Sequence, residues 1–184
     1  NNLLAVQPEN IYVIAIHAGN YARPGSDEPD FRIDAGEALD REFEVDVIYG
    51  YPSGIINRHD FDGANVLSRS AWAKKGKEIH TEDAPVNLLM KSTFDGNTRE
   101  LAVTIEGYYT KQVEETVNFL NIAIVQSNIQ GPQNGGGAGS DYIHKHMLRA
   151  FITPEWGERI EKPQTGEYFT REYTYTLPND IKGV

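Results

Sequence analysis

Tyr49-Gly50-Tyr51-Pro52-Ser53-Gly54-Ile55-Ile56-Asn57 is the stretch on which the fold of the first half depends. A proline that follows Gly-Tyr and opens a short β-branched run is typical of a turn that leads into a strand. Because a turn that opens a strand is where a cis X-Pro bond is tolerated, we predict a cis peptide bond at Tyr51-Pro52.

A strand and a helix are predicted upstream of this turn. Residues 11–17 form a continuous apolar run that ends near Gly19, which favours a strand buried on both faces, as in a parallel sheet. Asp34 and Glu37 have the spacing of a capping box, and the apolar positions that follow recur at helical spacing. We therefore expect an amphipathic helix over residues 34–44.

A hairpin and a second helix are predicted downstream of the turn. Asp62-Gly63 is a typical hairpin dipeptide between the strand at 55–57 and a further strand at 66–67. Ser68 or Ser70 then precedes a helical pattern that continues to His80. This alternating order predicts an α/β domain over residues 1–83.

The second half has the pattern of an all-β domain. At Asp83-Ala84-Pro85 the periodicity changes from helical to alternating, which places a domain boundary there. Residues 117–129 are apolar at nearly every position and predict one central strand, joined by a Gly-rich loop to residues 142–152. That last segment also fits a helix, but as the partner of 117–129 it is better explained as a strand. We expect an antiparallel, immunoglobulin-like β-sandwich over residues 84–184.

Composition and charge exclude several classes of function. The 184 residues include 17 Lys and Arg against 27 Asp and Glu, which gives a formal net charge of −10. Such an acidic chain is poorly suited to binding nucleic acid or an anionic membrane surface. It contains no Cys, so disulfides, thiolate metal sites and a cysteine nucleophile are excluded. No phosphate-binding loop, nucleophile elbow or zinc-protease motif is present, and no cofactor is predicted.

Several local motifs resemble one family along nearly the whole chain. They include Ile-His17-Ala-Gly19, Asp34-Ala-Gly36, Tyr51-Pro-Ser-Gly-Ile-Ile-Asn-Arg58, Asp62-Gly63, Trp72, Tyr142-Ile-His144-Lys-His146-Met-Leu-Arg149 and Thr153-Pro-Glu-Trp-Gly-Glu158. Together they resemble the 28-kilodalton outer-membrane-protein family of Bacteroidales-type bacteria. The Tyr-x-His-x-His-x-x-Arg run is the most specific of these motifs.

The resemblance implies an exported, often lipid-anchored protein with a thioredoxin-like N-terminal half and a β-sandwich C-terminal half. Some members of the family carry a Cys-containing segment before the first strand found here. The chain lacks that segment and its cysteines, and we expect the first elements of its thioredoxin-like domain and the last strand of its sandwich to be missing as well. The chain begins with Asn1-Asn2, which we interpret as a mature product, an engineered sequence or a fragment.

Candidate site residues come from two places in the chain. Tyr51 and Pro52 lie at the turn where a thioredoxin-like fold, which the resemblance implies, has a cis-proline that faces the redox cysteines. Because this chain has no Cys, Pro52 can only shape a loop. His144 and His146 would share one face of a strand, yet two imidazoles are too few for a specific metal site, so hydrogen-bonded histidines are expected. The remaining candidates for binding are Tyr142 and Arg149.

Two functional hypotheses follow. The first is a non-catalytic extracytoplasmic module, at the outer membrane, the cell surface or in the periplasm, that binds an unidentified protein or glycan. Tyrosines concentrated in the second half favour such contacts, although they would equally form cross-strand pairs. The alternative is the body of a thiol–disulfide oxidoreductase whose Cys-containing segment lies upstream. Neither hypothesis involves nucleic acid, and a membrane is involved only through a lost anchor.

Overall fold

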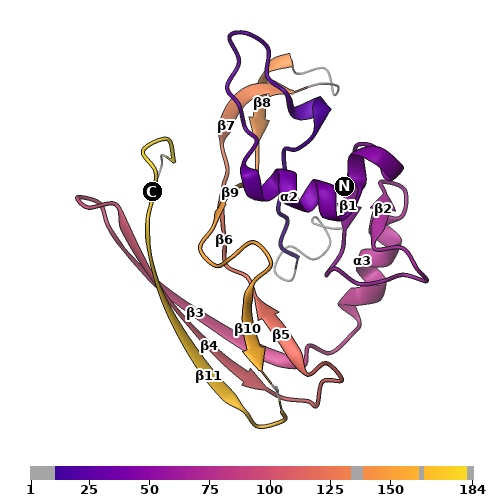
Figure 1. The fold of residues 1–184 in the computed structure, drawn as a ribbon, viewed down its shortest axis with the longest axis vertical. Helices are drawn as coiled ribbons and strands as arrows, with labels where there is room; N and C mark the ends of the chain where they lie inside the picture. Colours follow the sequence, from indigo (N-terminus) through magenta and orange to yellow (C-terminus); the bar gives the residue numbers. More distant parts are fainter. Residues whose placement is uncertain (1–10, 134–138, 162–163, 182–184) are drawn as a thin grey trace. The chain divides into compact units, whose positions relative to one another are not determined.

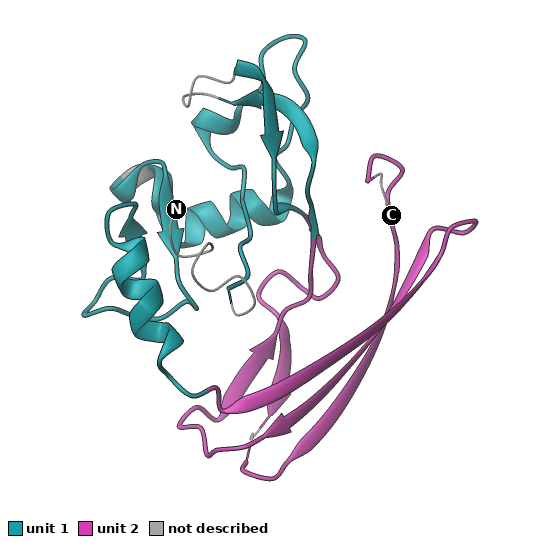
Figure 2. Ribbon diagram, turned by 180° about the vertical axis from the view of Figure 1, so that it is seen from behind, with its two compact units in different colours: residues 1–83, 125–148 teal, residues 84–124, 149–184 magenta. Residues whose placement is uncertain are grey.

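The computed structural model describes residues 11–133, 139–161 and 164–181 (Figure 1). These residues form two compact units, shown in different colours in Figure 2. Unit 1 contains residues 1–83 and 125–148, and unit 2 contains residues 84–124 and 149–184. The first division falls at the predicted boundary. The expectation of a continuous second domain over 84–184 is corrected, because residues 125–148 pack with the first unit.

Unit 1 combines helices with short antiparallel strands. Its two α-helices both match the sequence prediction closely in position. The elements are η1 (Asn20–Ala22), α2 (Asp34–Glu42), η2 (Val45–Tyr49), β1 (Ser53–Ile55), β2 (Val66–Ser68), α3 (Trp72–His80), β7 (Ile129–Gln133) and β8 (Gly139–His144).

Helix α2 forms without the predicted capping box. Ile33, in extended conformation, is the residue before the helix, and it makes no side-chain cap. Asp34 is already inside the first turn, where its negative charge is favourable at the positive end of the helix. Glu37 instead accepts a hydrogen bond from the backbone N–H of Gly19, 3.3 Å away. The predicted partner of Glu37 was local, whereas the observed one is 18 residues earlier in the chain.

The predicted hairpin is confirmed between β1 and β2. Phe61 and Ala64 exchange both backbone hydrogen bonds around Asp62-Gly63. The φ angles of Asp62 and Gly63 are 58° and 90°, the left-handed conformation that Asp and Gly adopt most readily in two-residue hairpins. Beneath the hairpin lies a small core made of Phe61, Leu67 and Ile79, against which Ile56, Ala71 and Trp72 pack.

Residues 11–17 do not form the predicted buried strand. Their only strand contact among the described residues is a parallel bridge between Ala15 and Met147. Ala15 donates to the carbonyl of His146 at 2.7 Å, and Leu148 donates to the carbonyl of Ala15 at 2.9 Å. Tyr12 is 91% exposed, and Val13, Ile14 and Ile16 are exposed as well. An apolar run is buried only where other layers cover it, and the described residues supply a neighbour on one edge alone.

Unit 2 is an antiparallel β structure with two facing sheets. In the first sheet, β4 (Glu100–Tyr109) lies between β3 (Val86–Asp95) and β11 (Tyr168–Thr176). In the second, β5 (Val117–Leu120) pairs with β10 (Glu158–Glu161). Buried Val103, Ile105 and Ile122 form the core, with Leu101, Leu120, Ile152, Phe169 and Tyr173 packed around them. The expected all-β, antiparallel class of this part is confirmed.

The predicted central strand over 117–129 is broken into pieces. It divides into β5, β6 (Ala123–Gln126) and the start of β7. Between β5 and β6, the N–H of Ile122 donates to the hydroxyl of Thr153 at 3.1 Å, so a side chain replaces a strand partner there. An apolar run cannot reveal such a break, because the break depends on which strand each piece pairs with: β5 pairs with β10, β6 with β9 and β7 with β8.

The segment 142–152 is strand rather than helix, as preferred from the sequence. It divides into the end of β8 and β9 (Met147–Phe151). β8 pairs antiparallel with β7, and β9 pairs with β6, so the two segments are partners across the Gly-rich loop as predicted. Residues 134–138 of that loop lie outside the described residues.

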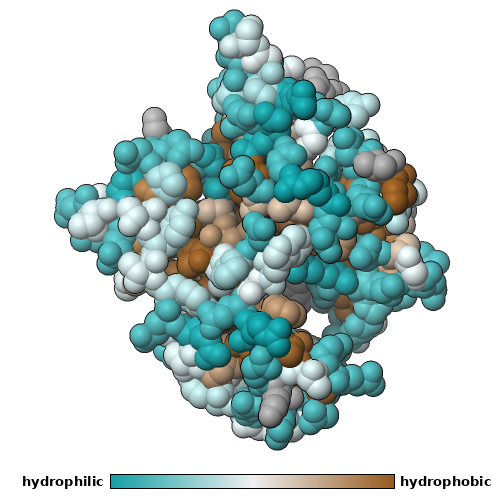
Figure 3. All heavy atoms as spheres, in the orientation of Figure 1, coloured by the Kyte–Doolittle hydropathy of each residue, from teal (hydrophilic) through white to brown (hydrophobic). Residues whose placement is uncertain are grey.

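The surface in Figure 3 is predominantly hydrophilic, with hydrophobic residues scattered among polar ones. This agrees with the acidic composition of the chain. Among the described residues, every helix is too short or too polar to cross a bilayer.

Candidate functional site: a charged cavity beside the Tyr51-Pro52 turn

The turn that the sequence singled out contains a cis Tyr51-Pro52 bond, as predicted. The hydroxyl of Tyr51 donates to Asp40 of α2 at 2.5 Å. Burial, reinforced by this hydrogen bond and by the Asp40 charge, raises the pKa of Tyr51 well above its usual value. Tyr51 is therefore a neutral donor that fixes the carboxylate of Asp40, whereas the Pro52 side chain is exposed.

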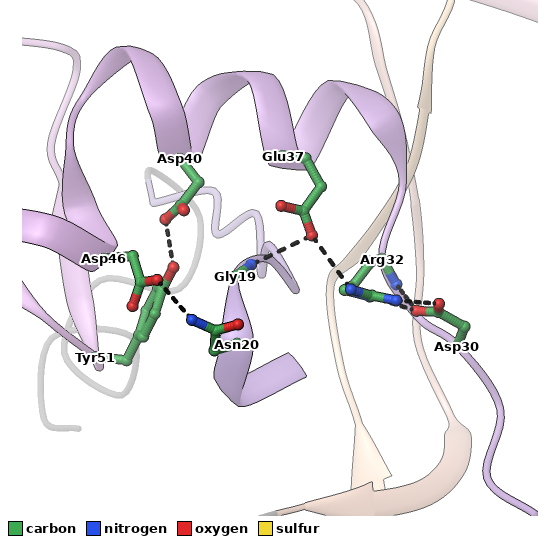
Figure 4. Close-up of polar contacts among 8 residues, drawn as sticks. All are labelled: Gly19, Asn20, Asp30, Arg32, Glu37, Asp40, Asp46 and Tyr51. Carbon is green, nitrogen blue, oxygen red and sulfur yellow. Dashed lines mark hydrogen bonds and ion pairs between the residues drawn. The ribbon is translucent and has the colours of Figure 1, made fainter. Parts of the chain in front are cut away.

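A second set of polar contacts lies at the start of α2 (Figure 4). Glu37 accepts from the N–H of Gly19 and lies 3.9 Å from the guanidinium of Arg32. Arg32 forms a two-point ion pair with Asp30, with distances of 2.9 and 2.7 Å. These hydrogen bonds and the Arg32 charge hold the pKa of Asp30 at about 2. Asp46 of η2 accepts from the side-chain amide of Asn20 at 3.3 Å.

These contacts surround a cavity of about 360 Å³ within unit 1. Seven of its lining side chains are ionisable: three guanidinium groups and four carboxylates. Their formal charges sum to 3 − 4 = −1, so the cavity is strongly polar but almost neutral. The lining residues are Gly19, Asn20, Arg23, Arg32, Glu37, Asp40, Arg41, Glu44 and Asp46.

Gly19 is the backbone position that shapes this cavity. Its φ is +67°, and a Cβ added there would overlap the hydroxyl of Tyr51. Gly50 has nearly the same backbone angles, with φ +68°, but open space around it. Substituting Gly50 therefore tests the backbone strain alone, whereas substituting Gly19 tests the same strain together with the overlap with Tyr51.

We expect Gly19→Ala to lower the free energy of unfolding by about 1 kcal/mol more than Gly50→Ala does, because both suffer backbone strain but Gly19→Ala also displaces Tyr51. Urea unfolding of the two variants would measure the difference. Equal costs would show that the close approach of Tyr51 to Gly19 is unimportant.

The second group of predicted site residues gathers around His144. Its ring lies 4.8 Å from Tyr142, 4.9 Å from His17 and 5.0 Å from Phe31, measured between ring centres. All four residues belong to unit 1. Nε2 of His144 donates to the carbonyl of Pro132 at 3.2 Å. Gly131 admits this arrangement, since a Cβ there would overlap the Phe31 ring.

His17 is the residue of this aromatic cluster that pattern analysis assigned to a strand end. Its Nδ1 is buried and has no hydrogen-bond partner among the described residues. Burial, and secondarily the nearby His144, lowers the pKa of His17 to about 4. Burial also lowers the pKa of His144. Both rings are therefore neutral at pH 7.

The expectation that His144 and His146 share a strand face is wrong. β8 ends at His144, and His146 has a left-handed backbone with φ 56° and is exposed. The backbone N–H of His146 donates to the hydroxyl of Ser127, which links the turn between β8 and β9 to the connection between β6 and β7. A strand that bends after His144 breaks the two-residue alternation on which the prediction depended. In the described parts of the chain, no three His, Asp or Glu residues cluster as metal ligands would.

Arg149 belongs to unit 2, whereas the other predicted site residues belong to unit 1. It lies in the part of β9 that belongs to unit 2, where it forms an ion pair with Asp180. The structure thus brings Tyr142 and His144 together and gives Tyr51 a place next to the cavity. Sequence reasoning missed the cavity, since its residues come from two stretches of the chain, 19–23 and 32–46, and no motif indicates that the two stretches meet. The one signal was Gly19, which ends a motif quoted for the family resemblance, together with Glu37, which directly follows the motif Asp34-Ala-Gly36.

The fold and site together define a two-unit protein, part α/β and part antiparallel β, with a polar cavity in its first unit. The profile of the family described as outer membrane protein Omp28 matches residues 37–183. The chain therefore belongs to the Omp28 family, which confirms the resemblance seen in the sequence. Membership places it outside the cytoplasm, at the outer membrane or cell surface.

One solved structure shows the same fold over most of the chain. HBP35 of Porphyromonas gingivalis superposes with a TM-score of 0.60 at 20% sequence identity. The match covers 78% of this chain but only 46% of HBP35, so this chain corresponds to about half of that protein. No curated protein matches the sequence.

Proposed function

We propose that this envelope protein is a non-catalytic binding module and that the cavity of unit 1 binds a carbohydrate. The observation that carries the proposal is the composition of the cavity wall, with three guanidinium groups and four carboxylates in about 360 Å³. Such a wall offers many hydrogen-bond donors and acceptors at almost no net charge.

Carbohydrate hydroxyls match this wall chemically. Each hydroxyl both donates and accepts, so it can donate to a carboxylate such as Asp40 while it accepts from a guanidinium such as Arg41. Hydrogen bonds to charged groups are stronger than those between neutral groups, so a neutral ligand still gains affinity. A strongly anionic or cationic ligand would instead meet like charges in the wall.

An aromatic surface lies beside the cavity. Tyr21 is 70% exposed, and its ring meets that of Tyr51 edge to face at 5.8 Å. An exposed tyrosine ring offers a flat apolar surface to the C–H face of a sugar. A protein ligand would be anchored by a separate apolar pocket, whereas the apolar part of this lining consists of the stems of the same side chains that carry the charged groups. The observations therefore favour a glycan over a protein.

The scaffold proposed for this role is a thioredoxin-like unit 1 followed by an immunoglobulin-like unit 2. The order of α2, β1, β2 and α3 in unit 1 and the facing antiparallel sheets of unit 2 support it. Thiol–disulfide exchange requires a thiolate, and the 184 residues contain no Cys. The binding role therefore takes precedence over the redox alternative for the residues given.

Nuclear magnetic resonance would test the carbohydrate proposal directly. The ¹⁵N-labelled chain would be titrated separately with cellotetraose, maltotetraose and chitotetraose, which are neutral and hydroxyl-rich. We expect at least one of them to shift the amides of Gly19 and Asn20 saturably. Glu37→Ala should weaken that binding at least about tenfold, because it removes a charged hydrogen-bonding group from the wall.

Glu78→Ala is the matched control. Glu78 lies in α3 of the same unit, pairs with Lys75 at 2.9 Å and does not line the cavity, so its loss should leave the affinity unchanged. A chain that shows no shifts with any of the three sugars would contradict the proposal. Saturable shifts of Gly19 only with a panel of zwitterionic tetrapeptides would identify a peptide site instead.

A further inference from the structure

The edge strand β3 leaves part of the unit 2 sheet uncovered. β3 is ten residues long and pairs with β4 in unbroken register from Val86 to Asp95 (Figure 1). Its other edge has no strand partner among the described residues. A long, regular edge strand exposes a row of backbone donors and acceptors that can pair with another strand.

The inner face of the sheet continues onto this edge. Met90 is opposite buried Ile105 of β4, and Leu88 is opposite Gly107. Residues directly opposite each other in an antiparallel pair point to the same side of the sheet. Yet Met90 is 62% exposed and Leu88 is 59% exposed. The face that forms the core on β4 is therefore apolar and open on β3.

The usual protections of an edge strand are missing from β3. Residues 86–95 contain no proline, and their register with β4 has no bulge. The only basic residue is Lys91, which is opposite Thr104 on the outer face of the sheet. Lys91 is already paired with Glu106 of β4 at 3.1 Å, so it does not keep another strand away.

We propose that β3 pairs antiparallel with β3 of a second copy of this chain, which joins two three-stranded sheets into one. A twofold axis through Met90 pairs even-numbered residues with even-numbered ones. Because alternate residues of a strand point to opposite faces, this keeps the inner faces of both sheets on one side. In this register Met90 meets Met90, Leu88 meets Ser92, Val86 meets Phe94 and Leu89 meets Lys91 of the other copy. Such a contact is isologous and closed, so it ends at a dimer.

Charge selects this register over its neighbours. A twofold axis through Lys91 would place two ammonium groups directly opposite each other, which is unfavourable. An axis through Leu89 would bring Asp95 opposite Asp83. The register through Met90 avoids both like-charge pairs and forms two apolar pairs, Met90 with Met90 at the axis and Val86 with Phe94 further out. This self-complementarity is the reason for assigning the edge to a second copy.

The dimer should also respond to salt. Each chain carries a formal net charge of −10, so two copies repel one another at low ionic strength. Added salt screens this repulsion. We expect the dissociation constant to fall between 20 and 300 mM NaCl, opposite to the behaviour of a contact held by ion pairs.

Analytical ultracentrifugation of the full chain over a concentration series would test the proposal. Met90→Lys should raise the dissociation constant at least about tenfold, since it places like charges together at the twofold axis. Thr174→Lys, which adds the same charge to an exposed position of the opposite edge strand β11, should have no such effect. A chain that is monomeric at every concentration and salt level would overturn the proposal, as would equal effects of the two variants.

Disulfide cross-linking through an introduced cysteine tests the same pairing of β3 strands if Met90→Lys fails to fold. Because the chain has no Cys, a single introduced thiol can only cross-link two copies. Directly opposed residues bring their Cβ atoms close enough for a disulfide, so Met90→Cys should oxidise to a covalent dimer much faster than Thr174→Cys. Equal rates would rule out the pairing. This outcome is independent of carbohydrate binding, because β3 belongs to unit 2 and the cavity to unit 1.

Discussion

Met147→Ala is expected to lower the free energy of unfolding of unit 1 by about 3 kcal/mol, because a fully buried Met is replaced by a side chain that leaves a cavity. Met147 has an exposed fraction of 0% and lies where Ala15 bridges to β9. Urea unfolding followed by the fluorescence of Trp72, with Trp156 replaced by Phe, would report on this unit.

The chain supplies its own control, since Met90 is its only other methionine. Met90 is exposed on β3, so Met90→Ala should change stability by less than about 0.5 kcal/mol at concentrations where the chain is monomeric. Similar losses for both variants would contradict the burial of Met147.

Acid should destabilise unit 1 through His17. The folded-state pKa of His17 is about 4, and that of an unfolded histidine is about 6.5. Between these values the unfolded state binds more protons, so the free energy of unfolding falls as the pH falls from 6.5 through 4. The ring is partly exposed and partly screened by water, so the loss attributable to His17 is about 2 kcal/mol.

His17→Phe tests this prediction, because it keeps an aromatic ring next to Phe31 and His144 but cannot bind a proton. The free energy of unfolding of this variant should depend less steeply on pH between 6.5 and 4 than that of the unsubstituted chain. The difference in slope should correspond to at most one proton taken up on unfolding. His80→Phe, at an exposed position of α3, should leave the pH dependence unchanged. If the free energy of unfolding had the same pH dependence in His17→Phe and in the unsubstituted chain, the lowered pKa of His17 in the folded state would be contradicted.

Local patterns predicted the elements whose causes are local. The Asp62-Gly63 hairpin, α2, α3 and the turn at Pro52 depend on neighbours in the sequence, and all were found from it. Long-range packing decided the rest. Nothing near Glu37 in the chain indicates that it binds the Gly19 backbone, and nothing near His144 indicates that its neighbour is His17 rather than His146.

The cavity escaped prediction for the same physical reason. Its wall joins residues 19–23 to the stretch from Arg32 through α2 to the π-helix η2, and these two stretches meet only once the chain is folded. Charged residues on a helix are usually only solvated, so Glu37, Asp40 and Arg41 carry no signal by themselves. The family resemblance indicated the location of the protein, whereas only the folded structure shows where a ligand could fit.

The path of the chain between its units has a consequence for biosynthesis. Residues 125–148 complete unit 1 but are synthesised after the first half of unit 2. As the chain emerges from the ribosome, the packing of unit 1 therefore stays incomplete until His144 and Met147 have been synthesised. The sheets of unit 2 in turn stay incomplete until β10 and β11, which come later in the chain, have been synthesised. Neither unit can finish folding before most of the other exists, so their assembly is coupled in time by the order of the gene.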